Sequence, residues 1–185
     1  MAKLIPTYIR PQLVPFLFKE LEGSEANYMS KQVKSIIIYP SSSLGKYLHS
    51  QFKNTVKLKK KDKFIIYLTI EKKTFNIFYG VLYVEIDKIK EKLMLSEESV
   101  NSINYLIEDM FRIAFVYYVD GGTGSGKSKI TTAIDCFIEK YDLLEVGFSN
   151  NNLRTLYYRE KKKGCKLSRM QYHSSNRVMN FDQTM

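Results

Sequence analysis

The residues best suited to chemistry gather near the C-terminus, where cations greatly outnumber acids. Residues 154–177 contain eight basic side chains and one acid, Glu160. A helix that runs to Lys163 would place Arg154, Tyr158 and Lys161 on one outward stripe. Cations on such a face pair with phosphate oxygens, and a tyrosine contacts sugars or bases. The predicted nucleic-acid-binding residues are Arg154, Thr155, Tyr158, Arg159, Lys161, Lys162, Lys163, Lys166 and Arg169.

The whole chain is also basic, which bears on what this helix does. It has 29 Lys and Arg against 19 Asp and Glu, a formal net charge of +10. A charged helix face is often simply solvated, but such a face normally mixes both signs. The near absence of acid therefore favours an anionic partner, with nucleic acid ahead of membrane surfaces and acidic proteins. DNA is the favoured partner, although the residues leave DNA and RNA both open.

A second pattern is the glycine-rich segment GGTGSGKS at residues 121–128, which matches G-x-x-x-x-G-K-[ST] at every fixed position. It resembles the Walker A loop of P-loop NTPases. The resemblance implies that backbone amides around Gly124 and Gly126 wrap phosphates, that Lys127 reaches the β- and γ-phosphates, and that Ser128 holds Mg²⁺. ATP or GTP with Mg²⁺ would then be the ligand; no other cofactor is predicted.

The surroundings of this segment do not match that family. The family's loop follows a buried parallel strand, whereas the apolar residues before Gly121 recur at helical spacing. Residues 113–119 could be a strand instead, because they are aromatic and β-branched, but no later strand ends in an aspartate. Two further interpretations stay open. The segment is a flexible linker between helices, or it is a helix N-terminus that clasps a DNA phosphate with Lys127 and Lys129.

The elements that position these residues predict an α+β fold, with a small antiparallel sheet and helices in residues 1–95. The spacing of Leu13, Phe16, Leu17 and Leu21 predicts one helix, and Ser41–Ser43 can begin another. Strands are expected over 33–39, 64–70 and 75–84, the last two forming an antiparallel hairpin, with a short helix over 87–93.

Residues 96–163 are predicted to form a three-helix unit. The first helix begins at Ser96 and should end near Tyr118, since the following glycines do not sustain a helix. The second covers 130–141. The third has Ser149 as its N-cap and turns three side chains inward, namely Leu153, Leu156 and Tyr157. Residues 164–185 are expected to be a basic, flexible tail.

The last two helices of this unit resemble a helix-turn-helix, with the final helix in the recognition position. Their connection, 142–148, is longer than the three to four residues of that motif. Residues 133–163 are also similar to small DNA-binding proteins of Bacteroidetes phages and mobile elements. These resemblances imply a regulator or replication accessory factor. The alternatives are a P-loop nucleotide-binding protein and a phage structural protein that contacts packaged DNA.

Other sequence features limit the class of protein. No triad, carboxylate pair or metal-ligand cluster stands out, so a non-enzymatic role is favoured. Cys136 and Cys165 form no CxxC pair, which suits a reducing compartment. The N-terminus has no apolar signal region, and no apolar run is long enough to span a bilayer. A cytoplasmic protein without a membrane partner is expected, with association with virions as the alternative.

Overall fold

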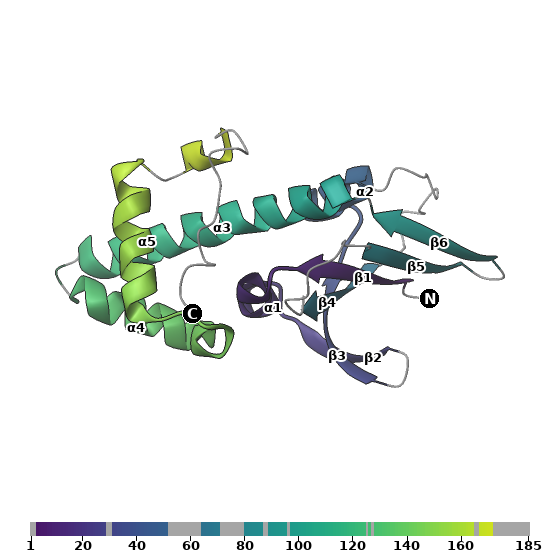
Figure 1. The fold of residues 1–185 in the computed structure, drawn as a ribbon, viewed down its shortest axis with the longest axis horizontal. Coiled ribbons are helices and arrows are strands. Elements are labelled where there is room, and N and C mark those ends of the chain that lie inside the picture. Colours follow the sequence, from purple (N-terminus) through teal and green to yellow (C-terminus); the bar gives the residue numbers. More distant parts are fainter. Residues whose placement is uncertain are drawn as a thin grey trace. The chain divides into compact units, whose positions relative to one another are not determined.

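The computed structural model describes residues 3–28, 31–51, 64–70, 80–86, 89–95, 97–124, 126, 128–164 and 167–171. The fold is α+β, as the sequence predicts. The chain divides into two units, Met1–Asn104 and Tyr105–Met185, which are described separately below. Figure 1 shows the strands in the first unit and the pair of helices α4 and α5 in the second.

The first unit is built on a four-stranded sheet of order β1-β4-β3-β2. β1 (Lys3–Ile9) runs parallel to β4 (Phe64–Ile70), while β3 (Lys31–Ile38) is antiparallel to β4 and to β2 (Ser24–Tyr28). Parallel strands need a long crossover connection, so β1 and β4 pair across a wide separation in sequence. The predicted strands at 33–39 and 64–70 are confirmed, but the sheet is mixed rather than purely antiparallel.

The predicted hairpin between 64–70 and 75–84 is wrong. β4 lies between β1 and β3, whereas β5 (Gly80–Ile86) pairs with β6 (Ile89–Leu95) in a separate two-stranded antiparallel sheet. The helix predicted over 87–93 is therefore largely strand β6. A short apolar segment of this length fits either structure, and pairing with β5 decides which one forms.

The helices of the first unit lie where the apolar spacing predicts them. The 3₁₀ helix η1 (Pro11–Leu13) leads into α1 (Val14–Glu20), and α2 (Ser43–Gln51) follows the sheet strand β3. Proline is tolerated in the first turns of η1 and α1 because the amides there have no partner within the helix. The buried core combines residues of these helices with strand residues, namely Ile9, Leu13, Val14, Phe16, Leu17, Ile36, Ile38 and Leu48.

The second unit contains the three predicted helices. α3 (Glu97–Gly124) begins in the first unit, and α4 (Ile130–Lys140) and α5 (Asn150–Lys162) complete the bundle. The 3₁₀ helix η2 (Leu143–Val146) lies between α4 and α5, and α5 lies across α3 in Figure 1. Aromatic rings fill the core, with Phe115 packing at 5.0 Å from Phe137 and 6.4 Å from Tyr157 between ring centroids.

α3 continues past its predicted end at Tyr118 and stops at Gly124. Tertiary contacts hold the added turns. Val119 is fully buried, and the Asp120 carboxylate accepts a hydrogen bond from the Tyr157 hydroxyl of α5 at 2.6 Å. Each glycine weakens a helix by about 1 kcal/mol relative to alanine, and these tertiary contacts offset that cost.

The predicted flexible tail contains an ordered element, η3 (Leu167–Gln171). α5 ends at Lys162 with Lys163 as its C-cap, and Gly164 follows with a φ of +65°, a conformation that suits glycine. η3 then returns Arg169 to the interior, where it is 2% exposed. The lysine-rich run 53–63, together with Lys166 and residues 172–185, lies outside the described residues.

Candidate nucleic-acid interface

The N-terminus of α5 is fixed by two sets of local contacts. The Ser149 hydroxyl accepts a hydrogen bond from the Asn152 amide, which confirms the predicted N-cap. The Asn150 side-chain amide donates to the Asp135 carboxylate at 2.7 Å and to the Thr131 carbonyl at 3.1 Å, both on α4. α4 therefore sets the position at which α5 begins.

Packing then decides which face of α5 meets water. Leu153, Leu156 and Tyr157 are buried, as predicted. The opposite side is exposed, and we call its residues the α5 cationic face: Arg154, Thr155, Tyr158, Lys161, Lys162 and Lys163. Tyr158 is 49% exposed, and the Arg154 guanidinium lies over its ring at 5.9 Å from the centroid. Arg159 lies at the edge of this face and is half-buried.

Glu160, which the sequence places among the outward cations, points inward instead. It is 0% exposed, and its carboxylate accepts hydrogen bonds from the guanidinium groups of Arg112 and Arg169. Glu160 is the single acid in the sequence of α5. Its burial leaves the exposed side of this helix without a carboxylate of its own.

Arg169, which the sequence predicts to bind nucleic acid, lies in the interior instead. Its guanidinium contacts Asp109 at 2.9 Å and Glu160 at 2.8 Å, and all three side chains are buried. Because Arg169 is buried and two carboxylates balance its charge, it is not available to hold a phosphate. A charge count along the chain misses this because it carries no information about burial.

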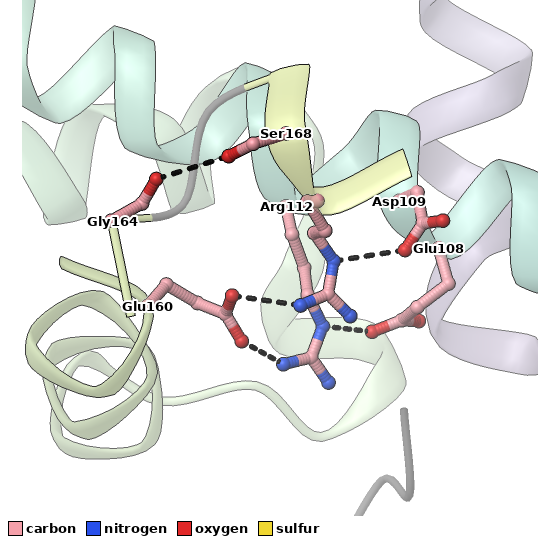
Figure 2. A network of polar contacts seen from close by, with 7 residues as sticks. Glu108, Asp109, Arg112, Glu160, Gly164 and Ser168 are labelled. Carbon is pink, nitrogen blue, oxygen red and sulfur yellow. Dashed lines mark hydrogen bonds and ion pairs between the residues drawn. The ribbon is translucent and has the colours of Figure 1, made fainter. Parts of the chain in front are cut away.

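A buried ion network links α3, α5 and η3 beneath the α5 cationic face (Figure 2). Arg112 donates to Glu108 and to Glu160. Burial acts to lower the pKa of Arg112, but the two adjacent glutamates outweigh it and raise this pKa overall. Glu108 and Arg112 stand beside Ile107 and Phe111 in the apolar pattern of α3, and all four are buried. Two charged residues of opposite sign within an apolar pattern were the signal in the sequence for this buried ion pair.

Lys161 is held in place by a neighbouring pair. Its ammonium donates to the Tyr157 hydroxyl at 2.8 Å and to the Asp120 carboxylate at 2.9 Å, and Tyr157 donates to the same carboxylate at 2.6 Å. These hydrogen bonds raise the pKa of Lys161. Burial, and then the bond to Asp120, raise the pKa of Tyr157. Lys161 thus stays charged, while Asp120 balances part of its charge.

The glycine-rich segment does not have the geometry of a phosphate-binding loop in its described residues. Residues 113–119 are helical, so the alternative strand is wrong, and Gly121–Gly124 form the last turn of α3. The amides of these glycines fall within the hydrogen-bonded body of the helix. The Ser128 hydroxyl donates to the Gly122 carbonyl at 2.9 Å, and the Gly126 amide donates to the Thr123 carbonyl. Lys127 lies outside the described residues.

Comparison of the chain with protein-family models, with curated proteins and with solved structures finds no match. The similarity to small phage DNA-binding proteins stays a prediction. Across the described ranges, none of the helices combines the length and apolarity needed to cross a bilayer. The same ranges hold no group of three or more His, Cys, Asp or Glu side chains arranged to bind a metal ion.

Proposed function

We propose that this protein binds nucleic acid, with DNA the favoured partner, through the α5 cationic face. The observation that carries the proposal is the burial of Glu160, because it removes the only acid of α5 from the surface. Exposed cations without interspersed acids attract a polyanion, and phosphate contacts release counterions from it. The exposed Tyr158 adds a group able to contact sugars or bases.

A binding titration at several salt concentrations tests this proposal. Fluorescently labelled duplex and single-stranded oligonucleotides are mixed with the wild-type chain and with the triple variant Arg154→Ala, Lys162→Ala, Lys163→Ala. If these three cations each neutralise one phosphate, their loss makes the negative slope of log K against log salt shallower by up to about 2.7 for duplex DNA. Affinity at low salt falls accordingly.

A matched variant in the first unit serves as the control. Lys19, Lys34 and Lys46 are exposed, and replacing all three with alanine removes the same charge from another surface. This variant should keep most of the wild-type salt slope. An equal loss in both triple variants, or no association of the wild-type chain with either oligonucleotide at low salt, rules out the proposal. Co-purification with virions separates a structural phage protein from a regulator, since both roles use this face.

A further inference from the structure

Three arginine side chains come close enough beside α5 to affect one another electrostatically: Arg112, Arg159 and Arg169. The guanidinium groups of two of them bind carboxylates in the interior. Arg112 and Arg169 share the Glu160 carboxylate, and each also contacts a second carboxylate on α3. The carboxylate of Glu160 therefore already serves two guanidinium groups.

Arg159 differs from the other two. It is half-buried, and its Nε–H is shielded from solvent with no hydrogen-bond acceptor among the described residues. Within the part of the chain that the structure describes, no carboxylate forms an ion pair with it. Burial first, and then repulsion from Arg112, lower the pKa of Arg159. A shielded donor without an acceptor costs free energy, so the described part of the protein leaves this Nε–H unsatisfied.

The position of Arg159 on α5 suits an external anion. Residues three and four positions apart lie next to each other on a helix, so Arg159 is beside Lys162 and Lys163. Both lysines are exposed. An oxyanion that reaches Arg159 from solvent would meet two further positive charges at the same point on the helix.

We propose that Arg159, assisted by Lys162 and Lys163, is a fixed binding position for one phosphate group. This inference rests on the proposed function and makes it more specific, since the phosphate is taken to be a phosphodiester of the bound polynucleotide. The planar guanidinium presents paired N–H donors that match phosphate oxygens, and lysine cannot reproduce that geometry. Arg159 thus sets where the backbone lies, whereas the exposed cations contribute mainly charge.

The first test compares two conservative variants in oligonucleotide binding. Arg159→Lys keeps the charge and removes the donor geometry, and Arg154→Lys makes the same change at an exposed position. We expect Arg159→Lys to weaken binding about tenfold at fixed salt, and Arg154→Lys by no more than about twofold. Wild-type affinity in Arg159→Lys overturns the inference, and the proposed function then still stands on the wild-type binding.

The second test uses the wild-type chain, so it does not depend on the folding of a variant. Inorganic phosphate is titrated while the arginine Nε–H resonances are followed by NMR. The Arg159 resonance should shift with saturation, and the Arg154 resonance should move far less. Equal or absent shifts overturn the inference. A selective Arg159 shift in a chain that binds no oligonucleotide supports the phosphate site, assigns it to a small phosphate ligand, and rejects the proposed function.

Discussion

The buried ion network makes Glu160→Gln the most informative single substitution for stability. Glutamine has nearly the same shape, so the change removes charge without opening a cavity. Glu160 is 0% exposed and accepts hydrogen bonds from both Arg112 and Arg169. In the variant, an amide N–H₂ group replaces one acceptor oxygen and faces a guanidinium donor. Two buried cations then lose much of their compensation.

The expected loss of stability is large. Removing one partner of a buried ion pair costs roughly 3–5 kcal/mol, because an uncompensated charge remains inside. Small proteins are stable by only about 5–15 kcal/mol in total. With a urea m-value of about 1–3 kcal/mol/M, a loss of 3 kcal/mol moves the unfolding midpoint down by at least about 1 M. η3 should lose its attachment first, since Arg169 is held there by Glu160 and Asp109.

Urea unfolding followed by far-UV circular dichroism measures this change, and hydrogen exchange of residues 167–171 reports on η3. Glu139→Gln is the control, because Glu139 is an exposed acid on α4. Exposed substitutions usually alter stability by no more than about 0.5 kcal/mol. A Glu160→Gln midpoint equal to that of Glu139→Gln, with unchanged exchange in η3, would refute the reasoning that Glu160 compensates two buried cations.

Substitutions at three further positions test local features of the second unit by the same urea measurement. Ser149→Ala removes the N-cap of α5 and should cost about 1 kcal/mol, whereas Ser149→Asp should retain most of it. Tyr157→Phe removes the hydroxyl that bridges Asp120 and Lys161 and should cost roughly 0.5–1.5 kcal/mol; no loss would mean that the bridge does not stabilise the fold. Gly121→Ala should stabilise by about 0.5–1 kcal/mol, because Gly121 is helical with open space where a Cβ would lie; destabilisation would contradict its assignment to α3.

The sequence predicts the elements whose signals are local. The apolar spacing of α4 and the N-cap Ser149 define helices through residues only a few positions apart. The inward positions of Leu153, Leu156 and Tyr157 follow from the same periodicity. The excess of cations near the C-terminus is likewise visible in the sequence, although the nucleic-acid binding inferred from it stays a proposal.

Strand pairing and the end of α3 depend on contacts between distant residues. β1 pairs in parallel with β4 some sixty positions later, so no local pattern specifies the partner. β6 is a strand because β5 lies beside it. α3 passes through its glycines because Val119 is buried and Asp120 binds Tyr157 of α5.

The sequence alone determined that α5 is amphipathic and rich in cations, because side-chain type and helical spacing are properties of the chain itself. Only the tertiary structure decided which charges remain at the surface. Arg112 and Glu160 are 48 positions apart, yet they meet in the interior, and η3 brings Arg169 to the same carboxylate. A charge leaves water only where opposite charges and donors surround it, and folding alone supplies those neighbours.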